Sequence, residues 1–346
     1  MQFASDNTGP VHPKVLESLS RANEGYAMGY GADPIMEDVT ARIRDLFDAP
    51  EAAVHLVING TTANSLILAT MSNPWDTIFC ADIAHIEEDE ANAPEFFTGG
   101  AKLTLVPSDG GKIAPDDLQT KIEAQGNRGV HGPQRGPLSI TQATETGSIY
   151  SLPEIKALTD TASNYGLATH LDGARFANAM VRLGCSAADM TTHAGIQTVS
   201  FGGTKNGLMG VEACVLLDPA LSDEFQYRRK RAGHLLSKHR YLSWQMQSYL
   251  KDDLWIDMAT LANTASDRLR HGMQRLNKVT VHGDPASNLF FASFPAADHQ
   301  RLRAAGAVYY ADEAGSDPAE QIKGRFVTNW STTEAEVDRF LDLLAT

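Results

Sequence analysis

The most constraining feature of the chain is one lysine that lies between two apolar runs. Residues 196–201 form the first run, residues 210–217 form the second, and the segment 202–207 between them reads GGTKNG. Short apolar runs bounded by glycine predict buried strands, and the glycines predict a tight turn that holds Lys205. Glycine also lets a ligand approach the backbone closely. A lysine that loses water there becomes a nucleophilic amine, whereas the simpler interpretation is a solvated turn residue.

An aspartate earlier in the chain gives this lysine a partner. Asp172 follows the apolar segment 165–171 and precedes Gly-Ala-Arg, which opens a helical pattern. The junction of a strand end and a helix is where open α/β sheets bind ligands. Pyridoxal phosphate needs an amine for its aldehyde and an acid that keeps its ring nitrogen protonated. Asp172 and Lys205 together therefore make pyridoxal phosphate the expected cofactor.

A third segment supplies a site for the phosphate group. Residues 53–58 form a short apolar run, and the residues after it, NGTTAN (59–64), open a helix. The free N–H groups and the dipole at the start of a helix bind phosphate. Gly60 permits close approach, and Thr61 and Thr62 add hydroxyl donors, although both threonines also fit a plain capping role. We expect these three residues to form the phosphate cup.

These segments resemble the low-specificity L-threonine aldolase family, which belongs to the fold-type-I pyridoxal-phosphate enzymes of the aspartate aminotransferase superfamily. The matching segments follow the order of the family and are spread over nearly the whole chain. They are SDNTG (5–9), YGADP (30–34), NGTTAN, His85 with Glu90, HLDGAR (170–175), GGTKNG and Arg325.

The resemblance implies an α/β fold: a large fold-type-I domain with a mainly parallel central sheet, and a small α+β domain at the C-terminal end. We expect residues 1–250, including an N-terminal arm, in the large domain and residues 251–346 in the small one. Apolar periodicity and turn residues predict the elements. The expected helices cover 13–23, 34–47, 60–71, 115–125, 153–165 and 254–276, with a last helix capped by Ser331 or Thr332. The expected strands cover 53–58, 76–81, 102–106, 137–141 and 167–171, then 279–282, 288–294, 308–309 and 324–328.

The family resemblance also implies roles at the cofactor. Lys205 would form the Schiff base, and Asp172 would hold the ring nitrogen. His85 would stack on the ring and act as the candidate base, with Glu90 beside it. Arg175 would face the phenolate oxygen, or else pair with Asp172. Lys238 would reach the phosphate of a neighbouring subunit.

For the substrate, the resemblance implies that Ser5 and Arg325 hold the α-carboxylate, since an arginine is its natural bidentate clamp. Tyr30 would lie beside the active site, often across a subunit interface. His131 matches a family histidine in the second layer around the site, although a surface loop is the alternative. The segment 142–145 reads QATE where many members carry Glu-Asn-Thr-His, which would change the pocket for the substrate side chain.

The expected reaction is the cleavage of L-threonine or L-allo-threonine into glycine and acetaldehyde by a homodimer or homotetramer with shared active sites. Two alternatives keep the cofactor: an aldolase for aromatic substrates such as phenylserine, and a β-eliminating lyase. A non-catalytic binding protein on the same fold is a more distant alternative.

Composition excludes several other classes. The net charge of −14 and the pI of about 5.2 argue against nucleic-acid and anionic-membrane partners. No apolar run approaches the ~18 residues of a membrane span. Three cysteines without metal spacing suit a reducing compartment, so we expect a cytoplasmic protein. We expect no metal at His85, because the acidic run 87–90 after it resembles a solvated face and no second histidine has suitable spacing.

Overall fold

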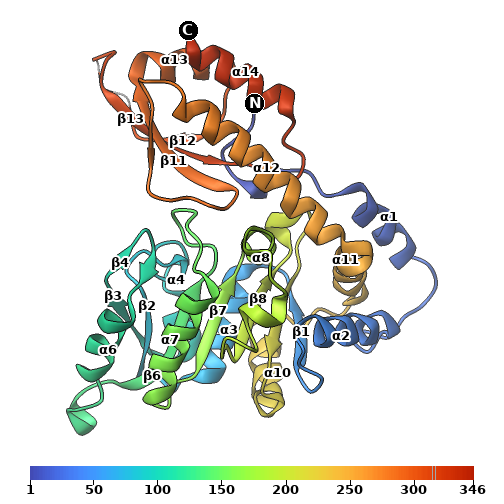
Figure 1. Ribbon diagram of the computed structural model, residues 1–346. Helices are drawn as coiled ribbons and strands as arrows, with labels where there is room; N and C mark the ends of the chain where they lie inside the picture. The colour runs from blue at the N-terminus through green and yellow to red at the C-terminus, as the bar shows by residue number, and fades with distance from the viewer. Residues whose placement is uncertain (314, 316) are drawn as a thin grey trace.

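The computed structural model describes residues 1–313, 315 and 317–346. A seven-stranded sheet in the order β1-β9-β8-β7-β6-β2-β3 forms its larger part (Figure 1). All neighbouring strands are parallel except β9, which is antiparallel to both β1 and β8. The mainly parallel sheet predicted from the sequence is therefore confirmed. The strands are β1 (Ala53–Val57), β2 (Asp76–Ala81), β3 (Lys102–Val106), β6 (Gln134–Thr141), β7 (Thr169–Gly173), β8 (Thr198–Gly202) and β9 (Glu212–Leu216).

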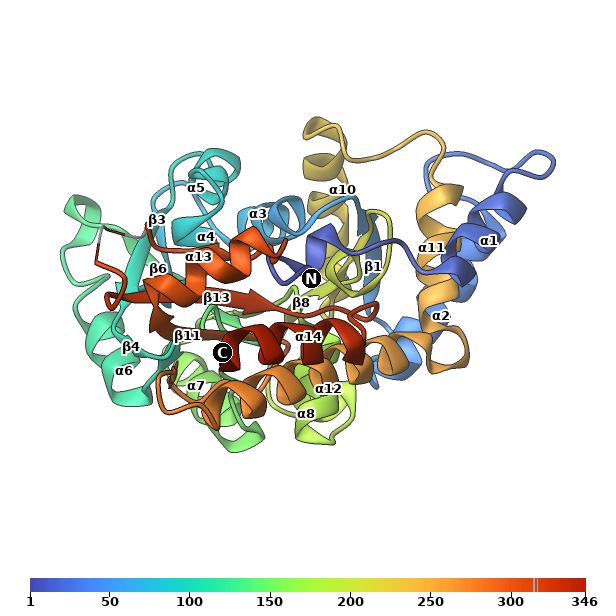
Figure 2. The same cartoon turned by 90° about the horizontal axis from the view of Figure 1, so that it is seen from above.

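Helices cover both faces of this sheet. Along β9, Cys214 and Leu216 belong to one apolar cluster with α3, whereas Ala213 and Val215 belong to the main core on the other side. Such strands are apolar throughout because both faces are buried. Figure 2 shows α3 (Gly60–Met71) and α5 (Ala93–Thr98) on one side, and α7 (Leu152–Asn164) and α8 (Phe176–Leu183) on the other. The remaining helices of this part are α1 (Pro13–Ala22), α2 (Pro34–Leu46), α4 (His85–Glu88), α6 (Pro115–Glu123), α9 (Ala187–Met190), α10 (Ser222–Arg231) and α11 (Arg240–Leu250).

A second, antiparallel sheet in the order β10-β11-β13-β12 forms the smaller C-terminal part. Its core is aromatic, with Phe290, Phe294, Phe326 and Phe340 all fully buried. This confirms the predicted small α+β unit. Its elements are α12 (Leu254–Gln274), β10 (Thr280–His282), β11 (Leu289–Pro295), α13 (Ala296–Ala304), β12 (Tyr310–Ala311), β13 (Gln321–Val327) and α14 (Glu334–Ala345).

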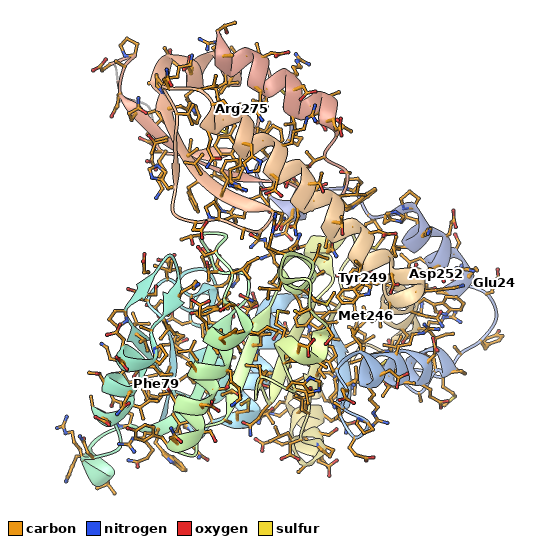
Figure 3. All side chains as sticks on the ribbon, in the orientation of Figure 1. Glu24, Phe79, Met246, Tyr249, Asp252 and Arg275 are labelled. Carbon is orange, nitrogen blue, oxygen red and sulfur yellow. The ribbon has the colours of Figure 1, made fainter. Side chains whose placement is uncertain are left out.

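Helix α12 joins the two parts. Its first turns place Trp255 and Met258 in the main core, and its last turns place Leu269 and Met273 in the aromatic core. In Figure 3 this helix runs from the region of Tyr249, which is buried in α11, to Arg275 beyond its last turn. A single rigid element thus belongs to both cores.

The N-terminal arm crosses to the smaller sheet. The backbone N–H of Phe3 donates to the carbonyl of Val308 (2.8 Å), and the N–H of Val327 donates to the carbonyl of Phe3 (2.9 Å). The Phe3 ring is fully buried in the aromatic core. The first residues of the arm therefore pack with the C-terminal part, while the division of the chain at residue 250 stays a prediction.

Most expected elements match, and the misses have physical reasons. The strands expected at 76–81 and 102–106 coincide with β2 and β3. Helix α13 was not predicted, because its sequence AADHQRLRA has almost no apolar stripe. Helix α11 and the short hairpin of β4 (Ser108–Asp109) and β5 (Lys112–Ile113) were also missed. The cap of the last helix is Thr333, not Ser331 or Thr332, because Thr333 forms a capping box with Glu336. None of the described helices has the length and apolarity that crossing a bilayer requires.

Candidate active site

The carboxyl ends of β7 and β8 bring the predicted amine and acid to one cavity. Asp172 lies near the end of β7, opposite Ser200 of β8, and Lys205 follows β8 in a 3-10 turn, Thr204–Asn206. A cavity of ≈190 Å³ is lined by both residues and by Gly60, Thr61 and His85. Five sequence-predicted residues from four distant segments thus meet here. The rest of the lining is Asn7, Asn59, Asn64, Ala174, Thr204 and Glu212.

Buried hydrogen bonds fix the turn that carries Lys205. The N–H of Gly203 donates to Oε2 of Glu212 at 2.7 Å. Nδ2 of Asn206 donates to Oη of Tyr249 and to the carbonyl of Trp255, both at 2.9 Å. Gly207 has φ +95°, and a Cβ there would lie 2.5 Å from a methionine sulfur, so the turn requires glycine. These contacts fix the backbone of the turn from which Lys205 projects.

Glu212 was missed by sequence reasoning. It lies in β9 and is 6% exposed, and burial raises the pKa of its carboxyl to about 7 despite hydrogen bonds from the Lys205 turn. The signal was one acidic residue inside the apolar strand sequence EACVL. A buried carboxyl needs hydrogen-bond partners, and here the turn before the lysine provides them.

The N-terminus of α3 has the form expected of a phosphate cup. Asn59 is the N-cap, and its Oδ1 accepts from the N–H of Thr62 at 2.9 Å. A Cβ built on Gly60 would meet no atom within 4 Å, so the backbone faces open space. Thr61 lines the cavity, whereas the hydroxyl of Thr62 pairs with Nε2 of His234 at 3.0 Å and lies outside the lining. Of the two threonines, Thr61 is therefore the one whose hydroxyl can donate to a phosphate in the cavity.

A hydrogen-bonded chain connects His85 to Asp172. Nδ1 of His85 lies 2.8 Å from Oε1 of Glu90, and Nδ2 of Asn64 donates to that same oxygen and to Oδ2 of Asp172, both at 2.9 Å. Burial acts to lower the pKa of His85, but the hydrogen bond to Glu90 and the charge of Asp172 raise it above its usual value. Burial raises the pKa of Glu90. Asn64 was not predicted from the sequence, since it reads as an ordinary residue of α3.

The same cluster offers potential metal ligands. One ligand atom from each of His85, Glu90 and Asp172 lies within 4.8 Å of the others. The amide N–H groups of Asn64, however, already point at both carboxylates and would repel a cation placed between them. Asp172 also accepts from the N–H of Ala174 at 3.0 Å. A protonated ring nitrogen of pyridoxal phosphate would need a single acceptor, and the carboxylate of Asp172 is an acceptor of that kind.

The N-terminal arm is tied to the site by a buried ion pair. Nε and Nη2 of Arg175 donate to Asp6 at 2.8 and 3.1 Å, and Nδ2 of Asn288 donates to Asp6 at 3.1 Å. Burial acts to raise the pKa of Asp6, but the charges of Arg175 and Lys205 hold it below its usual value. Arg175 pairs with Asp6 rather than with Asp172, the alternative partner expected from the sequence. Its contact with the cofactor stays a prediction.

The predicted carboxylate clamp, Arg325, does not line the Lys205 cavity. Arg325 of β13 lines a second cavity of ≈750 Å³, together with Glu145 and Asp89. Its Nη1 donates to the carbonyl of Ala4 at 3.2 Å, which connects the arm to the smaller sheet. Ser5 is the N-cap of a short 3-10 turn, and its Oγ accepts from the N–H of Asn7 at 3.1 Å. Asn7, rather than Ser5, lines the Lys205 cavity.

Three other predicted residues lie outside the cavity lining. Tyr30 is 54% exposed, and the Nζ atom of Lys230 lies at a distance of 5.1 Å from the centroid of its ring. Lys238 is also exposed. Their roles across a subunit interface stay predictions. His131 is exposed and precedes β6, whose other end pairs Thr141 with Asp172. It therefore lies at the amino edge of the sheet, which agrees with the surface-loop alternative.

Comparisons with known proteins agree with this geometry. The model of the family described as β-eliminating lyase matches residues 2–293. The chain is 37% identical to the low-specificity L-threonine aldolase of a Pseudomonas species, over 97% of this chain and 94% of that protein. It is 35% identical to the enzyme of that name from Pseudomonas aeruginosa, over 99% and 95%. A solved structure of Leishmania major threonine aldolase superposes with a TM-score of 0.92 at 27% identity, covering 99% of this chain and 98% of that one.

Proposed function

Because the chain belongs to the β-eliminating lyase family, and within it to the low-specificity L-threonine aldolases, we propose that it cleaves L-threonine and L-allo-threonine to glycine and acetaldehyde. The bond that breaks joins Cα and Cβ of a β-hydroxy-α-amino acid. The observation that carries the proposal is the convergence of Lys205, Asp172 and His85 on one cavity at the carboxyl edge of the sheet.

The residues around the cavity fit pyridoxal 5'-phosphate. Lys205 would hold its aldehyde carbon, Asp172 its ring nitrogen, and the start of α3 with Gly60 and Thr61 its phosphate. The open space in front of Gly60 supports this placement. Bound there, the cofactor supplies an electron sink for breaking a bond at Cα.

His85 is the proton acceptor for the β-hydroxyl in this proposal. Its Nδ1 is held by Glu90 at 2.8 Å, which leaves Nε2 as the ring nitrogen that accepts a proton. A histidine suits this task because its pKa lies near neutral pH. Glu90 fixes the tautomer in the way that an acidic partner orients a catalytic imidazole.

Arg325 and the arm residue Ser5 would hold the α-carboxylate. The hydrogen bond from Arg325 to the carbonyl of Ala4 brings the arm to the clamp. Fixing the carboxylate sets the rotation about the Cα–N bond and so selects Cα–Cβ over Cα–H for cleavage. Such positioning is worth ~7 kcal/mol or more in favourable cases.

The ≈750 Å³ cavity beside Arg325 supports a broad range of substrates. Its volume falls in the range of pockets that enclose drug-sized ligands, which exceed the methyl group of threonine by far. Bulkier β-hydroxy amino acids, including phenylserine, are therefore expected substrates as well.

A homodimer or homotetramer with shared sites completes the proposal. Among the residues that the structure describes, Lys205 is the only lysine or arginine lining its cavity. A phosphate group favours further cations, and Lys238 of a second copy would supply one. Tyr26, Met28 and Tyr30 form an exposed apolar loop that would pack in such an interface.

We further propose a cytoplasmic location. Cys80, Cys185 and Cys214 are all free thiols. Cytoplasmic reductants keep cysteines in that state.

An assay with L-threonine, L-allo-threonine and phenylserine tests the proposal. The holoenzyme should release glycine together with acetaldehyde from the first two and benzaldehyde from the third. Release of ammonia and an oxo acid would instead assign β-elimination. No product from any of the three substrates would refute the aldolase proposal.

A further inference from the structure

One buried amide occupies the centre of the site. Asn64 lies in the second turn of α3, is 2% exposed, and lines the Lys205 cavity. Its Nδ2 is 2.9 Å from Oε1 of Glu90 and 2.9 Å from Oδ2 of Asp172. An asparagine amide has two N–H hydrogens, so each carboxylate receives one. The nitrogen must face these oxygens, because an amide oxygen there would repel both.

The two carboxylates need this arrangement. Glu90 is 4% exposed and Asp172 2% exposed, and the two lie within 4.8 Å of each other. A neutral amide that donates to one oxygen of each carboxylate holds both groups in place. It adds no positive charge that would compete with a cationic ring nitrogen.

We propose that Asn64 is a positioning residue that couples Asp172 to the Glu90–His85 pair by fixing the positions of both carboxylates. The inference rests on the proposed function, since Asp172 serves a ring nitrogen only in a pyridoxal-phosphate enzyme. Asn64 acts through Asp172 and Glu90 and is not itself a catalytic residue.

Two further observations support the coupling. Oδ1 of Asn64 and Oε2 of Glu90 are buried without a hydrogen-bond partner, so the orientation of the amide follows from its two carboxylate contacts. The helix that carries it is packed against the sheet, because the neighbouring Leu66 and Ile67 are fully buried in the apolar cluster between α3 and the sheet. A change in the position of Asp172 is therefore transmitted through Asn64 to Glu90, and Glu90 transmits it to His85.

The test uses holoenzyme loaded with pyridoxal phosphate labelled with 15N in the ring. Asn64→Leu keeps the volume and removes both donors, and Asn64→Ala provides a smaller variant if leucine prevents folding. We expect the ring-nitrogen resonance to move from the protonated toward the unprotonated position. We also expect kcat to fall about 10- to 100-fold, as for a lost hydrogen bond to a charged group, with KM nearly unchanged.

Ser65→Ala is the matched control. Ser65 is the next residue of α3 and fully buried, and its hydroxyl has no hydrogen-bond partner. It should leave the resonance and kcat as in the wild type. Coupling is tested with Glu90→Gln, which should shift the ring-nitrogen resonance in the wild-type background and have little effect in Asn64→Leu.

The outcomes separate the two proposals. A wild-type protein that binds the cofactor and turns over threonine, with an unchanged ring-nitrogen resonance in Asn64→Leu, overturns the role of Asn64 alone. Equal shifts by Glu90→Gln in both backgrounds overturn the coupling. A wild-type protein that takes up no labelled cofactor refutes the proposed function, and the inference with it.

Discussion

At the scale of single residues, the contact between His85 and Glu90 controls when the imidazole can accept a proton. The hydrogen bond of 2.8 Å and the charge of Asp172 raise the pKa of His85 against the effect of burial. A base works only when unprotonated, so activity should rise as the pH passes this raised pKa.

Glu90→Gln removes the negative charge at Nδ1, and the pKa of His85 should fall. The acid limb of kcat/KM against pH should then move to lower pH, by about one unit for a lost charge-assisted hydrogen bond. Glu87→Gln is the control, because Glu87 is an exposed acid of α4, the short helix that begins at His85. A limb that stays in place, or that moves to higher pH, contradicts the assignment of His85 as the base.

The residues that could be predicted from the sequence are those with a local signal. Lys205 stands between glycines, Asp172 ends a strand, and Gly60 precedes a helix. Asn64 has no such signal, because it looks like an ordinary residue of its helix, and the signal of Glu212 is only that it is acidic in an apolar strand. The partners of Asn64 are also distant in sequence, since Asp172 lies 108 positions away. Only the assembled sheet brings these groups together.

At the scale of elements, the start of α3 and the N-terminal arm hold the site in place. The start of α3 presents a backbone without a side chain at Gly60, and the arm is fixed by the buried pair of Asp6 and Arg175. Sequence patterns predicted both elements. The pairing of Asp6 with Arg175 could not be predicted, since the residues lie 169 positions apart.

Gly60→Ala should weaken pyridoxal phosphate binding at least about tenfold, because the added methyl projects toward the space proposed for the phosphate. The φ of Gly60 is not in the left-handed region, so unfolding of the apoprotein should be unchanged or stabilised by less than about 1 kcal/mol. Pyridoxal, which lacks the phosphate, is the control ligand and should bind both proteins equally. A parallel loss of pyridoxal binding would contradict the phosphate cup.

Asp6→Asn should destabilise the protein by about 3–5 kcal/mol in denaturant unfolding, because it leaves Arg175 buried without its charged partner. Asp38→Asn breaks the exposed pair with Arg42 and should cost less than about 1 kcal/mol. The pKa of Asp6 is lowered, so its stabilisation is complete above the ordinary aspartate range and is lost as pH falls through the folded-state pKa. Equal costs for both variants would show that the arm is not anchored by this pair.

At the scale of the whole molecule, α12 contributes side chains to both cores, and the arm packs with the smaller one. Arg325 of the smaller sheet lines the second cavity together with Asp89 and Glu145 of the larger part. The α/β architecture could be predicted because the chain resembles a known family, and the local patterns added the bounds of individual strands and helices. The proposed assembly of subunits has no comparable pattern in one sequence, and its support is the resemblance to the family and the exposed Tyr26, Met28 and Tyr30.

Subunit mixing tests the shared site. Lys205→Ala and Lys238→Ala should each be nearly inactive alone. A hybrid dimer combines one subunit of each variant. If Lys238 serves the partner's site, one site of the hybrid has both lysines intact, and the other site has both replaced. Random pairing makes half of the dimers hybrids, so the mixture should regain about a quarter of the wild-type activity. Lys230→Ala, mixed in the same way, is the control. No recovery from two inactive variants would place Lys238 outside the partner's site.

Borohydride reduction of the holoenzyme, followed by digestion and peptide mass spectrometry, tests most directly whether Lys205 holds the cofactor. Reduction makes the bond between the lysine Nζ and the aldehyde carbon permanent. The pyridoxyl group should be found on the peptide that contains Lys205, and the Lys205→Ala protein should carry none. A label on another lysine, or no label in a protein that binds the cofactor and cleaves threonine, would contradict the site described here.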